Sequence, residues 1–314
     1  MRTKNAEPVT RAVGRTKQAF GVKKMEIIEL RKRLVKKILA KQDEHFRWGF
    51  DEKLAQERPE YLYYWPKYKS TLWALLLLAD IQAPVDIPQI EPSIQLITER
   101  FYKPEQGVFR LLDDSHSPIP CLNGNIIYLH YYFETSFSNK LEETINFFDT
   151  YQRFDDGDFK TPESYPYLSN TSCYGKHTCY QGVCKLLKGI SFIPKEKRAN
   201  RTTHLLENCI EFVLLHEVCF SSHNKDRFLH RDIDKLTFPS IRSDYLELLW
   251  LLAREGVQDK RTMRAVELLR SKMKEDGGWE LEKPIYNLTA SVGQKDRTNA
   301  FITERAMEVL EFYG

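Results

Sequence analysis

The segment "LRSKMKEDGGWEL", from Leu269 to Leu281, ends a helical pattern with a glycine turn and then an aromatic residue. Two earlier segments share this plan: "ITERFYKPEQGVF" (Ile97 to Phe109) and "FFDTYQRFDDGDF" (Phe147 to Phe159). Glycine can take the positive φ that ends a helix, and the aromatic residue after it can pack the turn against its neighbour. These segments, with a period of about 50 residues, predict a repeated helical hairpin.

A more apolar helix is expected after each of these turns. The candidates are "CLNGNIIYLHYYF", "HTCYQGVCKLLKGI" and "TNAFITERAMEVLEFY", and both "YKSTLWALLLLADI" and "RSDYLELLWLLARE" have the same character. One hairpin cannot bury its own apolar side, so several must stack in a ring or solenoid with the apolar helices inside. No long stretch alternates apolar and polar residues, and we therefore predict an all-α fold of about five helical hairpins.

The helical pattern begins with the amphipathic segment "MEIIELRKRLVKKILA" at Met25 and continues to the end of the sequence. No Pro-, Ser- or Gly-rich linker interrupts it, so residues 25–314 are predicted to form a single domain. Residues 1–24 are basic, poor in acids and without a sustained apolar face. This composition predicts a disordered basic tail, with an organellar transit peptide as the alternative.

Composition excludes several classes of protein. The 314 residues are 42% hydrophobic, enough for a sizeable core, and the net charge of +3 is spread over interspersed acids and bases. Such a distribution argues against a nucleic-acid partner, which needs a concentrated basic surface. No apolar run approaches the roughly 20 residues that span a bilayer, so no membrane span is expected. Six cysteines without an apolar secretory segment predict reduced thiols and a cytoplasmic location.

The turns "KMKEDGGWEL" and "YQRFDDGDF" resemble those of the α/α-toroid superfamily, which includes protein prenyltransferase β subunits and squalene-hopene cyclases. The resemblance covers nearly the whole chain after Met25. It extends to prokaryotic prenyltransferase-like proteins with segments similar to "CLNGN" and "CYGKHTC". It implies an α/α toroid of about five helical hairpins, although a shared fold specifies chemistry poorly.

The chain departs from the squalene-type cyclases because it lacks their DxDD acid motif. That motif needs a carboxylic acid that its neighbours hold protonated. The nearest candidates are Asp232 and Asp234 in "RDIDK", and Asp155, Asp156 and Asp158 in "DDGD". The first pair is expected in an exposed loop and the second group in a repeat turn, where acids usually cap helices.

Protein prenyltransferases instead bind zinc through Asp, Cys and His at the toroid mouth, and they normally need an α subunit. In antiparallel hairpins, Cys121, Cys173 and His177 at the starts of inner helices would share a rim with His216, or alternatively His223, at the end of an outer helix. Thiolate and imidazole are the ligands that zinc favours, so a zinc site is predicted there. The C-x3-H-x-C spacing is not a standard zinc motif, and core or capping roles remain the alternative.

Two further roles are considered for the same segment. Cys179 is a candidate nucleophile with His177 as its base, although residues two apart on a helix do not face each other. Cys184 and Cys209 fall on apolar helix faces and are expected to be small core residues.

Aromatic residues are frequent on the predicted inner helices, and they favour an apolar ligand, although plain packing explains most of them. They are Tyr63, Tyr64, Trp65, Tyr68, Tyr128, Tyr131, Tyr132, Tyr174 and Tyr180. Asp244 is the preferred general acid or base, because burial beside aromatic rings raises the pKa of a carboxyl group. Tyr174 and His177 are further catalytic candidates, and helix capping is the alternative for Asp244.

The sequence thus favours a prenyltransferase-like or terpene-cyclase-like protein with an aromatic pocket for an apolar or prenyl ligand. A zinc ion is expected at the rim of this pocket, and the resemblance also allows a protein partner. One alternative is a non-catalytic toroid that binds a protein or lipid, whose centre should be filled by its own side chains. Another is a carbohydrate-active lyase or hydrolase on a similar ring, against which intracellular cysteine usage argues.

Overall fold

The structure, a computed structural model, describes residues 25–112, 118–167 and 171–314. The predicted tail, residues 1–24, lies outside the described residues. Helix accounts for 52% of the chain and strand for 3%, so the prediction of an all-α protein is confirmed. Among the described residues, no helix combines the length and the apolar character needed to cross a membrane.

Helices follow one another along the whole described chain, beginning with residues 25–39. They continue with α2 (Glu52–Glu57), α3 (Thr71–Asp80), α4 (Ile90–Phe101), α5 (Pro120–Tyr132), α6 (Leu141–Tyr151), α7 (Thr171–Tyr174), α8 (Tyr180–Ser191), α9 (Asn200–Leu215), α10 (Tyr245–Glu255), α11 (Met263–Ser271) and α12 (Ala300–Tyr313). Short 3-10 turns span Pro59–Tyr61, Ser136–Lys140, Lys195–Lys197 and Lys260–Thr262. An antiparallel pair, β1 (Tyr102–Lys103) and β2 (Val108–Phe109), follows α4.

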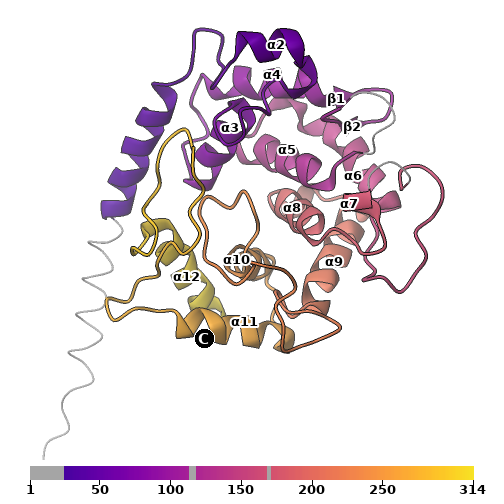
Figure 1. Cartoon of the computed structure of the whole chain (residues 1–314), viewed down its shortest axis with the longest axis vertical. Coiled ribbons are helices and arrows are strands. Elements are labelled where there is room, and N and C mark those ends of the chain that lie inside the picture. The colour runs from indigo at the N-terminus through magenta and orange to yellow at the C-terminus, as the bar shows by residue number, and fades with distance from the viewer. Residues whose placement is uncertain (1–24, 113–117, 168–170) are drawn as a thin grey trace, which may run out of the picture.

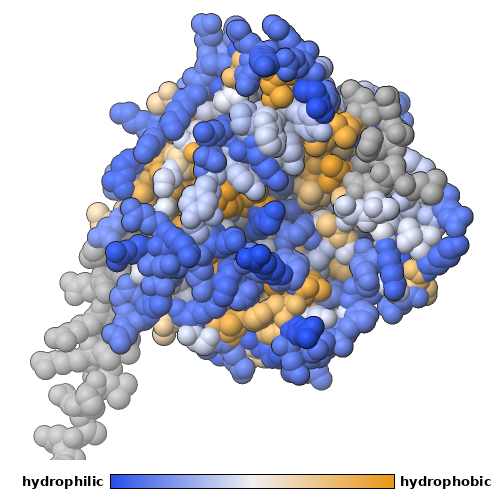
Figure 2. Space-filling view, viewed as in Figure 1, coloured by the Kyte–Doolittle hydropathy of each residue, from blue (hydrophilic) through white to orange (hydrophobic). Residues whose placement is uncertain are grey.

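The helices alternate between an inner and an outer row (Figure 1). In the inner row α3 contacts α5, α5 contacts α8, α8 contacts α10 and α10 contacts α12. Every residue of α3 is buried, and α8 is buried at nearly every position. In the outer row, α4, α6, α9 and α11 each bury one face and expose the other, as amphipathic helices do. On the face that Figure 2 shows, hydrophilic residues cover most of the surface.

Two glycines allow the helices α5 and α8 to pack unusually closely. A Cβ atom at Gly124 would lie 2.2 Å from the carbonyl oxygen of Lys185, and one at Gly189 would lie 2.5 Å from the carbonyl oxygen of Gly124. No real side chain tolerates such distances, so only glycine fits at either position. This close contact fixes α5 against α8 in the inner row.

The predicted repeat turns are present. Gly107, Gly157 and Gly277 have positive φ values of +64°, +98° and +73°. The preceding helices, however, end six residues earlier, at Phe101, Tyr151 and Ser271, so the glycines shape the turns and their expected role of ending the helices is wrong. The aromatic residues Phe109 and Trp279 are fully buried after the first and third turns. Phe159, however, is 70% exposed, so the expected packing of an aromatic residue is wrong for the second repeat.

Candidate functional site

Charged side chains fill the centre of the inner row. Lys188 on α8 lies 2.6 Å from Asp80 Oδ1 at the end of α3 and 2.9 Å from Glu247 Oε1 on α10. Lys185 Nζ lies 2.8 Å from Glu247 Oε2. All four side chains are at most 2% exposed. Buried charges persist only when they are paired and hydrogen-bonded, and each of these has an opposite charge in contact.

The network determines the ionisation of its shared carboxylate. Burial by itself would raise the pKa of Glu247, but the ammonium groups of Lys185 and Lys188 outweigh burial and hold the pKa at about 2. Tyr128 completes the network, because the Nζ atom of Lys188 lies 4.3 Å from the centre of its ring. The sequence gives one sign of this network, since Lys185 and Lys188 interrupt the apolar segment "GVCKLLKGI".

Asp244, the preferred catalytic acid or base, is the N-cap of α10. Its Oδ1 atom accepts a hydrogen bond from the Glu247 amide at 2.8 Å, and its Oδ2 atom accepts one from the Thr237 amide at 2.7 Å. The side chain is buried, and burial raises the pKa of Asp244 to about 6. The capping alternative is therefore observed, and a catalytic role for Asp244 stays a prediction.

Tyr174, the predicted aromatic catalytic residue, is also packed inside the protein. Its ring is 2% exposed, and its hydroxyl group donates a hydrogen bond to the carbonyl oxygen of Pro118 at 2.7 Å. Tyr180 is likewise buried and donates to the carbonyl oxygen of Val218. Both hydroxyl groups thus have backbone partners, as buried tyrosines usually do. Packing accounts for these two members of the predicted aromatic wall.

The predicted zinc ligands Cys121 and Cys173 lie together with Cys179, the candidate nucleophile, and we call these three residues the thiol cluster. Cys121 is in the first turn of α5, Cys173 is in α7 and Cys179 is the N-cap of α8. The side chains of Cys173 and Cys179 are hydrogen-bonded to each other. Burial, followed by the neighbouring Cys179, raises the pKa of Cys121 to about 11.

The predicted histidine ligands His177 and His216, and the alternative His223, have other neighbours. His177 Nδ1 lies 3.2 Å from Asp156 Oδ1, and His223 Nδ1 lies 3.1 Å from Asp156 Oδ2, with both imidazoles more than half exposed. Burial would raise the pKa of Asp156, but the hydrogen bond from Ser222 and the neighbouring imidazoles bring it below the ordinary value. His216 is buried, with its ring centre 5.1 Å from that of Tyr180.

The four predicted zinc ligands therefore do not share one site. Cys121 and Cys173 lie in the thiol cluster, His177 lies beside Asp156, and His216 packs against Tyr180. Across residues 25–112, 118–167 and 171–314, no three His, Cys, Asp or Glu side chains are placed so that they could hold one metal ion. The arrangement of these side chains does not fit the zinc site as predicted, and we derive no chemical step from a metal. Zinc binding at this rim stays a prediction.

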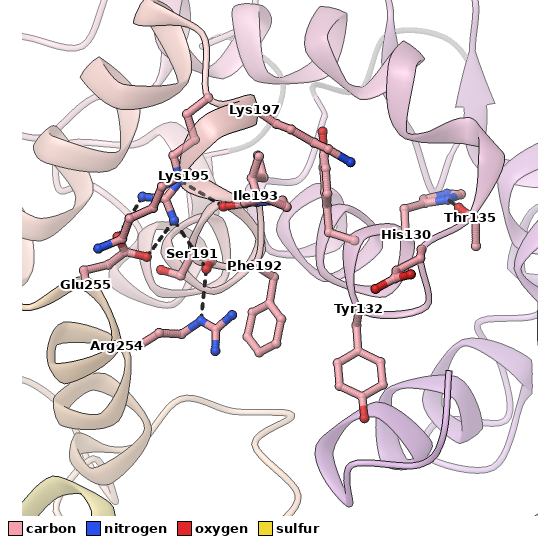
Figure 3. A pocket seen from close by; sticks show the side chains of 14 residues that line it. His130, Tyr132, Thr135, Ser191, Phe192, Ile193, Lys195, Lys197, Arg254 and Glu255 are labelled. Atoms are coloured by element: carbon pink, nitrogen blue, oxygen red, sulfur yellow. Dashed lines mark hydrogen bonds and ion pairs between the residues drawn. The ribbon is translucent and has the colours of Figure 1, made fainter. Parts of the chain in front are cut away.

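A cavity of about 830 Å³ opens where α5, α8 and α10 end, and the sequence analysis did not identify it. Its apolar lining comes from Tyr131, Tyr132, Phe192, Ile193 and Pro194. Figure 3 shows the rings of Tyr132 and Phe192, from α5 and the end of α8, projecting toward the same side of this cavity. The sequence does contain one sign of this cavity, the basic segment "FIPKEKR" (Phe192 to Arg198) directly after an inner helix.

Basic side chains surround the same cavity. Arg198 forms two hydrogen bonds with Glu255, at 2.7 and 2.9 Å. Arg254 donates to the carbonyl oxygen of Ser191 at 3.1 Å, and its guanidinium carbon lies 4.2 Å from the centre of the Phe192 ring. Such cations complement the partial negative charge of helix C-termini.

Lys195 and Lys197 also line the cavity, but they are exposed. Within the part of the chain that the structure describes, neither lysine forms an ion pair. Figure 3 shows the side chain of Lys197 extending across the cavity toward the side of His130. These two ammonium groups are therefore placed to contact a bound molecule.

No protein-family model matches this chain, and no curated protein matches it significantly.

Proposed function

We propose that this protein binds a small molecule that joins an apolar, isoprenoid-like body to an anionic head group, in the cavity at the ends of α5, α8 and α10. One observation carries the proposal: aromatic rings and two lysines without an ion pair among the described residues line the same cavity of about 830 Å³. A volume in this range suits a small-molecule ligand, since such pockets span roughly 300–1,000 Å³.

The apolar body would lie against the rings of Tyr132 and Phe192. Both side chains are partly exposed in the cavity, unlike the packed rings of Tyr174 and Tyr180. Each aromatic ring that a ligand covers contributes a large apolar area to binding. The surface available to an apolar ligand is thus at the end of the inner row rather than at its centre.

The anionic head group would be bound by Lys195 and Lys197. The other two cations of the cavity are already engaged, because Arg198 binds Glu255 and Arg254 binds the carbonyl oxygen of Ser191. A phosphate or diphosphate would therefore find two lysines without competing carboxylates on them. Ammonium groups bind phosphates well as flexible point charges.

For the fold, we propose an α/α toroid in which the first helix, residues 25–39, closes the inner row between α12 and α3. Arg31 supports this closure, since it forms an ion pair with Glu304 on α12 and donates to the carbonyl oxygen of Ile81 at 3.1 Å, directly after α3. Lys185, Lys188 and their acidic partners fill the centre of the inner row, where a cyclase would need room for its substrate. This favours a non-catalytic toroid that binds its ligand elsewhere over a terpene cyclase.

Calorimetric titration with three probes tests this function: geranyl diphosphate, geraniol and inorganic diphosphate. We expect geranyl diphosphate to bind most tightly, because only this probe contacts both the aromatic rings and the lysines. The double variant Lys195→Gln/Lys197→Gln should weaken its binding by about tenfold or more, equivalent to at least about 1.4 kcal/mol. Lys36→Gln, an exposed lysine on the first helix, is the matched control and should leave the affinity unchanged.

Two outcomes would contradict the proposal. Equal affinity for geranyl diphosphate in the double variant and in the Lys36→Gln control would show that the cavity lysines do not contact the head group. If inorganic diphosphate bound as tightly as the prenyl ester, the aromatic rings would contribute nothing.

A further inference from the structure

The ligand cavity presents a carboxylate as well as two lysines. Glu134 lines the cavity beside Tyr131 and Tyr132, and its side chain is exposed. Within residues 25–112, 118–167 and 171–314, the Glu134 carboxylate forms no ion pair or hydrogen bond. Glu255, the other acid of the cavity lining, is bound by Arg198 and its side chain is only 5% exposed. Glu134 is therefore the carboxylate that a bound molecule can contact.

The backbone of Glu134 has a conformation that glycine adopts more easily. Helix α5 ends at Tyr132, Glu134 follows with a φ of +52°, and the amide of Thr135 donates back to the carbonyl oxygen of His130 at 3.1 Å. A left-handed residue at a helix end costs less free energy when it is glycine, which has no Cβ atom. The inner helix α10 ends in this way, with Gly256 at a φ of +78°.

A second glutamate shows what a side chain in this conformation can do. Glu217 follows α9 with a φ of +42°, and its carboxylate lies 3.0 Å from Lys225 Nζ and 2.8 Å from a guanidinium nitrogen of Arg264. The left-handed position thus directs the Glu217 carboxylate to two cations of the protein. Glu134 has the same backbone conformation but lines the ligand cavity instead. This comparison indicates that the cation for Glu134 arrives with the ligand.

We propose that the ligand is an aliphatic amine phosphate, whose head group carries a phosphate monoester and, next to it, an ammonium group that Glu134 binds. This inference rests on the proposed function, because it assigns the head group of a molecule in the same cavity. The rings of Tyr131 and Tyr132, on the last turn of α5 beside Glu134, are partly exposed. The faces of aromatic rings attract cations, so this side of the cavity favours an ammonium group.

The charges of the cavity complement those of such a head group. Lys195 and Lys197 are positive and Glu134 is negative, while Arg198 and Glu255 neutralise each other. A phosphate monoester carries a charge of about −1.5 to −2 at pH 7, which matches the two lysines. The ammonium group matches the carboxylate. An ester without the amine would leave Glu134 unpaired and close to a second negative group.

Calorimetric titration with two probes that differ only in the amine tests this assignment: 2-aminodecyl phosphate and decyl phosphate. We expect the amine to tighten binding to the wild type by about fivefold, since an exposed ion pair reaches about this size. In Glu134→Gln the preference should disappear. The amine phosphate should bind more weakly than to the wild type, and decyl phosphate at least as tightly, because the repulsion is lost. A misfolded variant would weaken both probes.

Glu217→Gln is the matched control, because Glu217 has the same backbone conformation but is not part of the cavity lining. It should keep the preference for the amine. Glu134→Gly is a second variant, and it should fold because glycine suits a left-handed helix end. It should lose the preference, as Glu134→Gln does.

Three results would overturn the ammonium assignment. The first is equal affinity of the wild type for the two probes, and the second is a preference that persists in both Glu134 variants. The third is binding of decyl phosphate that Mg²⁺ tightens in the wild type but not in Glu134→Gln, because Glu134 would then hold a metal ion with the phosphate.

The double variant Lys195→Gln/Lys197→Gln distinguishes these results from a failure of the proposed function. If decyl phosphate binds the wild type and the double variant weakens it, the cavity does bind an anionic amphiphile, and only the ammonium assignment depends on the amine. If neither probe binds, or if the double variant has no effect, the proposed function fails and the inference fails with it.

Discussion

Glu247 is the residue whose replacement should disturb the centre of the molecule most. It is the carboxylate that Lys185 and Lys188 share, so Glu247→Gln would leave these buried ammonium groups with Asp80 as their remaining acidic partner. Breaking a buried ion pair typically costs about 3–5 kcal/mol. We expect a loss of this size in the free energy of unfolding from urea denaturation at pH 7.

The matched control for this prediction is Glu163→Gln. Glu163 pairs with Lys160 on the surface, where both side chains are more than three-quarters exposed. Exposed pairs contribute at most about 1 kcal/mol. Equal losses for Glu247→Gln and the control would show that the central network does not stabilise the fold.

His130 should make the protein sensitive to acid. It is 1% exposed, between the hydroxyl groups of Thr98 at 3.0 Å and Thr135 at 2.5 Å, and burial lowers its pKa from 6.5 to about 3. As pH falls below 6.5, the unfolded chain binds a proton at this residue but the folded protein does not. The associated stability is therefore fully present above pH 6.5 and is lost, at about 1.4 kcal/mol per pH unit, as pH falls toward 3.

The variant His130→Gln removes this titration. Its free energy of unfolding should be lower than that of the wild type at pH 7, but it should depend less on pH between about 4 and 6.5. His45→Gln, on an exposed histidine, is the control and should keep the slope of the wild type. Identical slopes for His130→Gln and the wild type would exclude His130 as the source.

Among the structural elements, α5 and α8 have the least tolerance for change. A Cβ atom at Gly189 would lie 2.5 Å from the carbonyl oxygen of Gly124 and 3.1 Å from the Cβ atom of Ile127, so the helices must separate to admit it. Gly189→Ala should destabilise by about 1–3 kcal/mol, and Gly189→Val by more, because overpacking grows with side-chain volume. Thermal unfolding followed by circular dichroism measures both.

Gly256 provides the comparison, because it has a positive φ of +78° but a Cβ atom there would have no neighbour within 4 Å. Alanine there should introduce backbone strain alone, of order 1 kcal/mol. The effect at position 256 should therefore not follow the volume of the new side chain as it does at 189. If the two positions showed the same dependence, the close contact of α5 and α8 would not explain the glycine at 189.

Elements were more predictable from the sequence than the site, for a physical reason. A glycine turn such as that at Gly277 is determined by residues next to it, so its repetition was visible in the sequence. The thiol cluster followed in part from antiparallel geometry, which brings Cys121 near Cys173. The direction of the His177 side chain depends instead on the loop that carries Asp156, and no local pattern encodes that contact. The cavity was not predicted because three separate helix ends build it.

For the whole molecule, the position of the first helix decides whether residues 25–314 unfold as one unit. Leu34 and Ile38 of this helix are buried in the common core. The carbonyl oxygen of Ile38 accepts a hydrogen bond from Trp48 Nε1 at 2.8 Å. Trp48 itself is 2% exposed, and the same helix contacts α12 through the Arg31 pair. A helix with such contacts should not separate from the rest before global unfolding.

Ile38→Ala tests this cooperativity. Ile38 is fully buried, and truncation of such a residue costs about 2–5 kcal/mol, whereas the control Ile28→Ala changes a side chain that is 40% exposed and should cost far less. Tryptophan fluorescence and far-ultraviolet circular dichroism should give one coincident urea transition, shifted to lower urea in Ile38→Ala. Two separate transitions, with only the first shifted, would mean that the first helix is an appendage and that the proposed closure of the ring between α12 and α3 is wrong.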